Sequence, residues 1–377
     1  MAGIYLHIPF CKTRCIYCDF YSTTRSEWTD RYVEALCTEL TRRKDYLQGE
    51  PVHTIYMGGG TPSQLSEEHF RKLFHTLQQV YGLEQCHEIT LEANPDDLTE
   101  EYTAMLKTLP FNRISMGIQT FHEDTLRLLH RRHTGAQAIR AVELCRKAGF
   151  QNISIDLIYG LPGENDFRWN QDLQQAIQLQ VEHISAYHLT YEEGTPLYDM
   201  LHQHSVQEVD EESSLRFFTS LMDTLKDAGY EHYEISNFCK PGFHSRHNTA
   251  YWQGIAYLGC GPSAHSFNGS SRQWNKASLS AYMNGIEQDT CIYETEQLDV
   301  YTRYNECVMT GLRTQKGISL KQLHHTFGMQ LKDYCLRNAD TYLKNGQLEI
   351  HNEYLRLTRA GIFISDGIMS DLMYITD

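Results

Sequence analysis

The sequence predicts an α/β protein, an incomplete (β/α)6 barrel followed by a small C-terminal domain that resembles a winged helix. Strand-like and helix-like segments alternate through the first two-thirds of the chain, which is the pattern of a parallel sheet. Polar residues also recur where these strands end, as they do at the C-terminal edge of a barrel. An open doubly wound sheet is the alternative, because periodicity alone does not separate the two folds.

Six strands and the helices between them make up the predicted barrel. The strands are expected at residues 4–8, 52–57, 88–93, 113–119, 152–160 and 183–191. The helices are expected at 28–47, after the capping residues Ser66 and Thr99, through Leu126, and at 138–148 and 215–227. Each βα pair of this length suits one unit of a parallel sheet.

The barrel pattern fades after residue 230, and we divide the chain into three domains. Residues 1–230 form the predicted barrel, 231–300 an extension rich in aromatic residues and histidine, and 301–377 the C-terminal domain. In the last domain a helix is expected to begin at the cap Ser319. QLEI and YLRL are expected to form a hairpin, and a final helix follows Gly361.

Composition excludes several classes of protein. No apolar run is long enough to cross a bilayer, so membrane contact is expected to be peripheral at most. The formal charge of −15 and the nearly neutral C-terminal domain argue against a nucleic-acid surface. The eleven cysteines are odd in number and mostly scattered, and no secretory signal opens the chain. We therefore expect a soluble protein of the reducing cytoplasm.

Three cysteines on one loop after the first strand are the strongest chemical signal. Cys11, Cys15 and Cys18 form the spacing C-x-x-x-C-x-x-C. Three thiolates can hold three irons of a [4Fe–4S] cluster, which leaves the fourth iron open to a small molecule. A zinc site with His7 or a distant fourth ligand is the alternative, although no second short ligand pair is present. A disulfide is disfavoured by the cysteine count and the expected compartment.

Further polar residues lie at the ends of successive predicted strands or, in the case of Asp156, within the strand. The glycines of GGGTP let backbone approach a ligand closely, although such a run is also an ordinary turn. Glu92 and Asp156 are suited to accept hydrogen bonds from ribose hydroxyls, or else to pair inside the barrel. Gln119 ends the fourth strand. Arg131, expected on the next helix, is suited to bind a ligand carboxylate, or else is solvated beside Arg132.

With these residues in view, the chain resembles the radical S-adenosylmethionine (SAM) proteins. The segments YLHIPFC, GGGTP, LEANP, MGIQTF and DLIYGLPG resemble the coproporphyrinogen dehydrogenase-like branch over nearly the whole chain. The resemblance implies a cluster whose open iron binds the amino and carboxylate groups of SAM. It also implies SAM contacts at Tyr5, Tyr17, Gly59, Gly60, Thr61, Glu92, Gln119, Arg131 and Asp156.

Two departures and one further motif favour the haem chaperone family HemW within that branch. The dehydrogenases carry another cysteine two residues after the third, where this sequence has Phe20, and they have an N-terminal extension before the cluster loop. The segment RHNTAYWQG resembles the H-N-x-x-Y-W motif of HemW proteins. It makes His247 the leading candidate for the haem-iron ligand, with Tyr251 and Trp252 as apolar contacts. His244 is the alternative ligand.

The resemblance implies a protein that binds haem and passes it to haem-accepting proteins, respiratory cytochromes among them. Its expected cofactors are a [4Fe–4S] cluster, SAM and haem, and an oligomer is compatible with the sequence. The rival is a radical SAM enzyme of porphyrin metabolism that resembles oxygen-independent coproporphyrinogen III oxidase, and alkyl or methyl transfer is a smaller possibility. We assign no role to the other eight cysteines, to the expected helical pair His130 and His133, or to His324 and His325.

Overall fold

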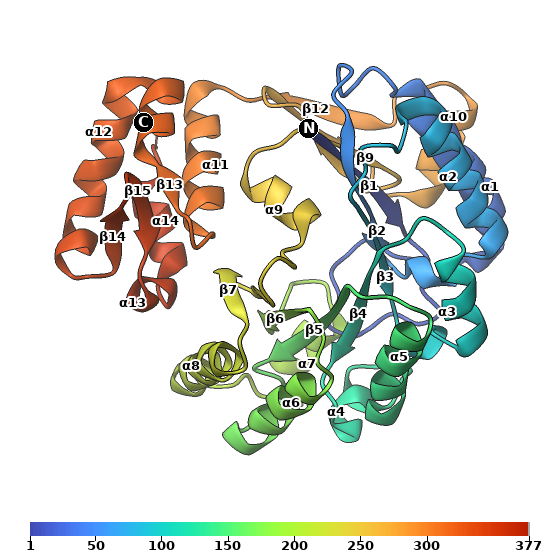
Figure 1. Ribbon diagram of the computed structural model, residues 1–377, viewed down its shortest axis with the longest axis horizontal. Coiled ribbons are helices and arrows are strands. Elements are labelled where there is room, and N and C mark those ends of the chain that lie inside the picture. The colour runs from blue at the N-terminus through green and yellow to red at the C-terminus, as the bar shows by residue number, and fades with distance from the viewer. Residues whose placement is uncertain (376–377) are drawn as a thin grey trace.

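A curved, open sheet forms the centre of the computed structural model, which describes residues 1–375 (Figure 1). Six parallel strands lie side by side in chain order. They are β1 (Ala2–Ile8), β2 (Val52–Gly59), β3 (Glu88–Ala93), β4 (Arg113–Gln119), β5 (Ile153–Tyr159) and β6 (His183–His188). All six predicted strands are present, and the sheet does not close. The incomplete barrel is therefore confirmed.

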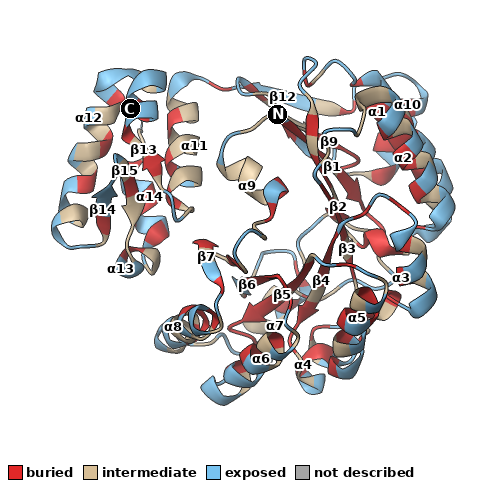
Figure 2. Cartoon of the chain, in the orientation of Figure 1, coloured by how far each residue is buried: buried red, intermediate tan, exposed pale blue. Residues whose placement is uncertain are grey.

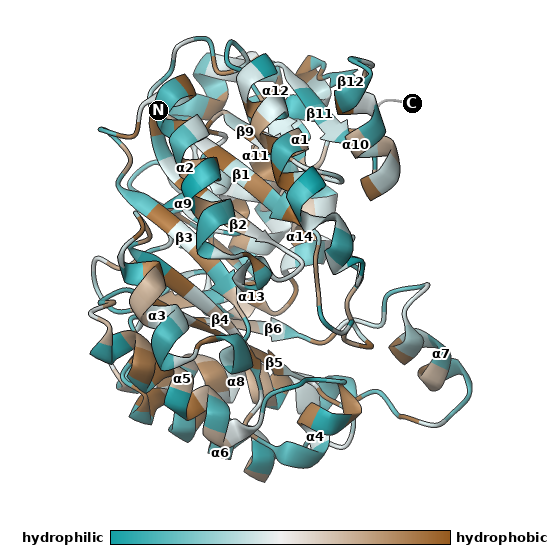
Figure 3. Ribbon diagram, turned by 90° about the vertical axis from the view of Figure 1, so that its right-hand side faces the viewer, coloured by the Kyte–Doolittle hydropathy of each residue, from teal (hydrophilic) through white to brown (hydrophobic). Residues whose placement is uncertain are grey.

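Most of the helices between these strands cover the outer face of the sheet. They are α1 (Thr29–Arg42), α2 (Glu67–Tyr81), α3 (Glu100–Lys107), α4 (Glu123–Leu128), α5 (Gly135–Lys147), α6 (Asp166–Gln178), α7 (Pro196–His202) and α8 (Glu211–Asp227), with short 3₁₀ turns at Ser26–Trp28, Pro62–Gln64 and Pro95–Asp97. α7 instead lies apart from the strands and packs near the loop after β1, where the Leu197 amide donates to the Ile16 carbonyl. Ser66 and Thr99 cap α2 and α3 as predicted. Apolar residues concentrate on the strands, whereas the outer helix faces are hydrophilic (Figures 2 and 3). Burial of the strands' apolar side chains drives this arrangement.

The segment after α8 adds strands to both edges of the barrel sheet. The added elements are β7 (Glu231–Glu234), β8 (Asn237–Cys239), α9 (Arg246–Trp252), β9 (Tyr257–Cys260), β10 (His265–Phe267), β11 (Ser271–Asn275), α10 (Leu279–Glu287) and β12 (Tyr293–Gln297). β8 pairs antiparallel with β6. At the other edge β9 pairs parallel with β1, and β10, β11 and β12 follow antiparallel. Strands this short give little periodicity, so this pairing was not predicted.

The C-terminal helices and a three-stranded antiparallel sheet have a hydrophobic core of their own. The elements are α11 (Val300–Leu312), β13 (Ile318–Ser319), α12 (Leu320–Lys344), β14 (Leu348–His351), β15 (Tyr354–Leu357), α13 (Arg359–Ile362) and α14 (Ser365–Leu372). Ser319 caps α12, and β14 and β15 form the predicted hairpin. The domain boundaries at residues 230 and 300 stay predictions. Within residues 1–375, no helix has both the length and the apolar character needed to span a bilayer.

A buried ion pair fastens the added strands to the barrel. Glu39 lies on α1 and Arg43 is the residue that follows its last turn, and their side chains are 1% and 8% exposed. The Glu39 carboxylate accepts hydrogen bonds from Tyr282 on α10 and Asn275 on β11. Arg43 donates to the carbonyl of Gly259 on β9 at 3.0 Å and to side chains of β10 and β11. One helix of the barrel therefore orients three strands of the extension.

Replacing Arg43 with Met is expected to lower the free energy of unfolding by about 3–5 kcal/mol, because it leaves the Glu39 carboxylate buried without its cation. Urea titration followed by circular dichroism measures this change. The matched control is Arg71→Met, which breaks the exposed pair between Arg71 and Glu67 and should cost about 1 kcal/mol or less. Equal losses in the two variants would show that the buried network contributes no more than a surface pair.

Candidate functional site

The three cysteines of the predicted cluster lie on the loop that follows β1. Cys11, Cys15 and Cys18 are half-buried, and none forms a disulfide. The Cys15 carbonyl accepts a long hydrogen bond from the Cys18 amide, 3.4 Å, which folds the loop back on itself. Burial raises the pKa of the Cys11 thiol and raises that of Cys18 to about 11. A metal that binds these sulfurs must therefore displace their protons.

Two polar side chains from other parts of the barrel contact the same sulfurs. Thr61, just after β2, places its hydroxyl 3.4 Å from Cys11 Sγ. Arg131 donates to Cys15 Sγ at 3.3 Å, to Asn94 Oδ1 at 2.7 Å and to the Gly117 carbonyl. Hydrogen bonds to cysteine sulfurs tune iron–sulfur clusters, so this donor set fits the predicted group. His7, the zinc alternative, is buried, and its ring nitrogens bond the Tyr5 hydroxyl and the Tyr21 carbonyl.

Arg131 occupies a different local structure from the one that we predicted. It lies in the turn after α4, which ends at Leu128, and not on a helix. His130 has a φ of 58°, a left-handed conformation that ends the helix and turns the chain back toward the sheet. The Arg131 Nε is buried and lacks a hydrogen-bond partner among the described residues. An unpaired buried donor beside the cluster loop fits the predicted binding of a ligand carboxylate.

The glycines that follow β2 make close contacts with β1. A Cβ on Gly60 would lie 2.7 Å from the Ile8 carbonyl oxygen, and Gly59, at a φ of 103°, would collide with the His7 ring. Glycine is required here because the end of β2 packs against the strand that carries the cluster loop. These glycines thus allow β2 to approach β1 closely. The Gly59 amide donates a hydrogen bond to Glu92 Oε2, 3.1 Å away.

Glu92 lies near the end of β3 and Asp156 in the middle of β5. Glu92 accepts a hydrogen bond from the Tyr56 hydroxyl at 2.6 Å. Burial, with a smaller contribution from the Asp156 carboxyl, raises the pKa of Glu92 from 4.5 to about 7. Burial likewise raises the pKa of Asp156 from 3.8 to about 6, against the opposing effect of the Ser185 hydroxyl. Two carboxyls with raised pKa values at one strand edge are typical of a binding site.

The remaining predicted SAM residues surround this edge. Gln119 is buried at the end of β4 with a φ of 70°, where the register against β5 shifts. Tyr17 lies beside Cys15 and Arg131, and burial raises the pKa of its hydroxyl. Tyr5 stands on β1, 6.3 Å from the Tyr56 ring. Asn94, which sequence reasoning missed, connects Thr61 to Arg131; its position directly after the third strand was the available signal.

A cavity of about 1230 Å³ opens between the cluster loop, the added strands and the C-terminal domain. Its walls include Phe20 and Tyr21 from the cluster loop, and Tyr251 and Trp252 from α9. Phe20, the residue at the position of the dehydrogenases' extra cysteine, is 64% exposed. Aromatic walls of this extent suit a large, flat, apolar ligand. The cavity therefore places the predicted haem motif beside the predicted cluster loop.

His247 itself lies behind the cavity wall. Its side chain is 2% exposed and stacks on Tyr56, with ring centroids 5.2 Å apart. Nδ1 bonds the Thr54 hydroxyl at 2.8 Å, and Nε2 bonds the Tyr251 hydroxyl at 2.9 Å. Burial lowers the pKa of His247 to about 3. The prediction that His247 binds haem iron therefore requires Tyr251 to release Nε2.

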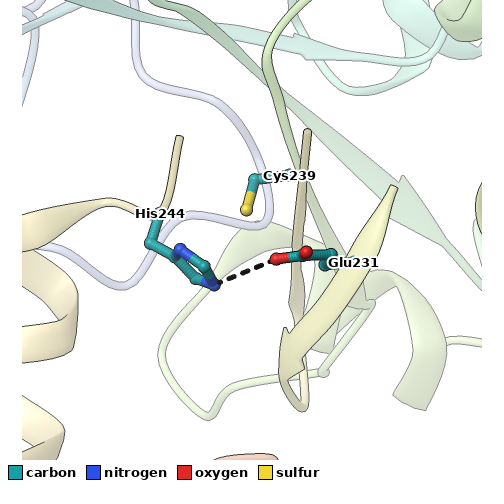
Figure 4. A group of neighbouring side chains, drawn as sticks. All are labelled: Glu231, Cys239 and His244. Carbon is teal, nitrogen blue, oxygen red and sulfur yellow. Dashed lines mark ion pairs between the residues drawn. The ribbon is translucent and has the colours of Figure 1, made fainter. Parts of the chain in front are cut away.

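Several other groups of potential ligands have structural explanations. His133 is buried and bonds the Ile118 carbonyl, and neither it nor His130 is on a helix. Glu231, Cys239 and His244 place ligand atoms within 4.8 Å of one another (Figure 4). However, His244 faces Glu231 at 3.6 Å, which gives two of the three groups a contact within the protein. No other observation points to a metal here, so we assign this group none.

Comparison with known proteins agrees with this geometry. The Radical SAM superfamily matches residues 5–176, and the HemN C-terminal domain matches residues 298–364. Proteins named Heme chaperone HemW are similar along the whole chain. The relative from Lactococcus lactis is 35% identical over 98% of this chain and 96% of its own length. The relative from Bacillus subtilis is 34% identical over 98% of this chain and 98% of its own length. The relative from Mycobacterium tuberculosis is 33% identical over 98% of this chain and 94% of its own.

This chain belongs to the HemW family. Its fold is also that of coproporphyrinogen III oxidase (HemN) from Escherichia coli, with a TM-score of 0.85 and 22% identity over 99% of this chain and 90% of that protein. The predicted family and fold are thereby confirmed. HemW and HemN share the barrel and the C-terminal domain, so the fold alone does not separate a chaperone from an oxidase.

The raised pKa of Glu92 predicts a pH-dependent stability of the cluster-free protein. An unfolded glutamate ionises near pH 4.5 and the folded one near pH 7, so the unfolded state loses its proton first. The contribution of Glu92 to the free energy of unfolding is therefore fully present below pH 4.5. It is lost as the pH rises through 7, and the total loss is about 3 kcal/mol. Urea titrations between pH 4.5 and 8 measure the loss.

Glu92→Gln should remove most of this pH dependence and leave the smaller part that Asp156 contributes. The exposed Glu68→Gln is the matched control and should follow the wild-type curve. A Glu92→Gln curve parallel to the wild type would contradict the assignment.

Proposed function

We propose that this protein binds haem in the large cavity and passes it to haem-accepting proteins, respiratory cytochromes among them, while it carries a SAM-liganded [4Fe–4S] cluster. One observation supports the proposal above the others. The cavity is lined both by the cluster loop, at Phe20 and Tyr21, and by the motif helix α9, at Tyr251 and Trp252. One cavity thus contacts both the cluster loop, which the resemblance assigns to SAM chemistry, and the motif helix, which it assigns to haem.

The residues of the barrel edge have separate tasks in this proposal. Cys11, Cys15 and Cys18 hold the cluster, whose open iron supplies a binding point for SAM. Arg131, with its unpaired Nε, binds the SAM carboxylate, and Glu92 and Asp156 accept hydrogen bonds from the ribose. The Gly59 amide and the Tyr56 hydroxyl hold the Glu92 carboxyl in place. The other predicted SAM contacts, Tyr5, Tyr17, Gly60, Thr61 and Gln119, complete this proposed site.

The motif residues have tasks on the cavity side. Trp252 and Tyr251 present aromatic faces to the macrocycle, and α9 is held to the barrel by Glu88, whose carboxylate accepts the amides of Arg246 and His247 at 2.9 Å. The cavity is partly open to solvent and is lined in part by the C-terminal domain, so haem can leave toward a docked acceptor without unfolding of the barrel. Handing over haem requires no radical step.

A radical SAM enzyme of porphyrin metabolism is the second candidate. The observation that favours it is the complete set of polar groups at the barrel edge, which a chaperone does not need for holding haem. Phe20 weighs against it, because this residue stands where the related oxidases carry a fourth loop cysteine.

Anaerobic reconstitution with iron and sulfide, followed by a haem titration, separates the two candidates. We expect one haem per chain, transfer of that haem to added apomyoglobin, and no decarboxylation of coproporphyrinogen in the presence of SAM and a reductant. Conversion of coproporphyrinogen with SAM cleavage, by protein that retains no haem, would overturn the proposal in favour of the enzyme.

Replacing Cys15 with Ala is expected to reduce bound iron from about four atoms per chain to near background, because two sulfurs on one loop do not hold the cluster. Iron and acid-labile sulfide analyses of the reconstituted protein measure this. Cys291→Ala, at an exposed thiol outside the loop, is the control and should keep the full iron content. Full iron in the Cys15 variant would show that the cluster is held elsewhere.

A further inference from the structure

We propose that Asp97 is a positioning residue, which holds the cluster loop, the loop after β2 and the turn that carries Arg131 in one arrangement before any cofactor binds. This inference rests on the proposed function, because it concerns the loops assigned to the [4Fe–4S] cluster and to SAM. Within residues 1–375, the Asp97 side chain bonds neither a loop cysteine nor a predicted SAM residue. Its effect on the site therefore passes through its partners.

The Asp97 carboxylate receives hydrogen bonds from three separate loops. It lies in the 3₁₀ turn after β3, and its side chain is 3% exposed. Its donors are Lys12 Nζ at 3.0 Å, Arg132 Nη2 at 3.1 Å, Ser63 Oγ at 2.8 Å and Gln64 Nε2 at 2.5 Å. A carboxylate has about four acceptor positions, so the protein itself uses the whole capacity of this one. We call these five residues the Asp97 network.

Each loop that donates to Asp97 also carries a group of the proposed cofactor site, one or two residues away in the chain. The neighbouring pairs are Cys11 and Lys12, Thr61 and Ser63, and Arg131 and Arg132. Only two soft dihedral angles per residue separate the members of a pair, so a bond at one member restricts the position of the other. One carboxylate therefore restrains all three parts of the site.

Asn94, three residues before Asp97, makes parallel connections closer to the sulfurs. Its amide side chain donates to Thr61 Oγ1 at 3.4 Å and accepts from Arg131 at 2.7 Å, and both of these partners contact sulfurs of the cluster loop. The Asp97 amide donates to the Asn94 carbonyl at 3.1 Å, and the Asn94 amide donates to Ser63 Oγ at 3.3 Å. The two residues thus belong to one hydrogen-bonded turn that joins the same loops twice.

The helix after this turn does not depend on the Asp97 carboxylate. α3 is capped by Thr99, whose hydroxyl accepts the Tyr102 amide at 3.1 Å. The Thr99 amide in turn donates to the backbone carbonyl of Asp97 and not to its side chain. Capping of α3 therefore gives no reason for a buried carboxylate at this position, whereas the three loops do.

The stretch between Cys11 and Cys15 is the part of the site that most needs such a restraint. Its three residues, 12–14, are exposed. Segments with few buried contacts open locally at a low cost in free energy. Lys12 Nζ, at 3.0 Å from Asp97 Oδ1, connects this exposed stretch to a buried group of the barrel. The contact is suited to keep the two cysteines at a fixed spacing.

Alkylation of the metal-free, full-length protein by iodoacetamide tests the positioning without any cofactor. Asp97→Asn keeps the shape of the side chain but places an amide NH2 among the four donors. We expect Cys11 and Cys15 to be alkylated at least about tenfold faster, the effect of losing a charged hydrogen bond that favours the closed loop. Mass spectrometry of the digested protein measures these rates, and the exposed Cys291 should keep its wild-type rate.

Two variants of Lys12 test the same contact from the loop. The Lys12 side chain is 56% exposed, so its replacement leaves the core of the barrel intact. Lys12→Met should raise the alkylation rates of Cys11 and Cys15 about two- to fivefold, because an ion pair with one exposed partner contributes less. Lys12→Arg keeps the cation and should stay within about twofold of the wild type.

Glu182→Gln is the matched control for a general loss of stability. Its carboxylate lies just before β6, at the opposite end of the barrel strands, with a side chain 11% exposed. It accepts hydrogen bonds from Arg146 at 2.7 Å and from the Ile153 amide at 3.1 Å. This variant should destabilise the fold and leave the alkylation rates of Cys11 and Cys15 at their wild-type values.

In reconstituted protein, Asp97→Asn should hasten the loss of the cluster to EDTA at least about tenfold, as removal of an outer group commonly does at metal sites. The visible absorbance of the cluster follows this loss. Wild-type alkylation rates in Asp97→Asn and Lys12→Met, or a wild-type rate of cluster loss in Asp97→Asn, would overturn the inference. Equal acceleration in Glu182→Gln would also overturn it. A wild type that holds no cluster would instead overturn the proposed function, and the alkylation rates would still decide the role of Asp97.

Discussion

The pairing of β1 on both of its edges is the constraint on which the rest of the structure depends. β1 pairs with β2 on one side and with β9 on the other, so the barrel and the added strands share one backbone ladder. The cluster loop leaves the end of β1, and the cavity wall begins at β9. Glu39 and Arg43 hold this junction from the outside through α1. Because both sites meet at one strand, displacement of β1 would disturb both.

Electrostatics differ sharply between the two sides of that strand. At the barrel edge, burial raises the pKa values of Glu92 and Asp156, so these carboxyl groups are harder to ionise than exposed ones. Across β1, the cavity is lined by Arg272, Arg303 and Lys316, and Arg272 is ion-paired with Glu306 at 2.8 Å.

His247, the predicted haem-iron ligand, lies next to the cavity and behind one residue of its wall. Its ring is buried between Thr54, Tyr56 and Tyr251, and Nε2 bonds the hydroxyl of Tyr251, which lines the cavity. The motif helix is also bound to the barrel through Glu88. Binding of haem iron by His247 stays a prediction, and it requires Tyr251 to release Nε2.

The sequence by itself determined the six βα units, the helix caps at Ser66, Thr99 and Ser319, and the cysteine loop, because these depend on local periodicity and spacing. It also placed Glu92 and Gln119 at strand ends and Asp156 within the fifth strand. Only the tertiary structure decided that β9 joins β1, that Arg131 lies in a turn against Cys15, and which residues line the cavity. These features depend on contacts between residues far apart in the chain, and such contacts leave no periodic signal in a single sequence.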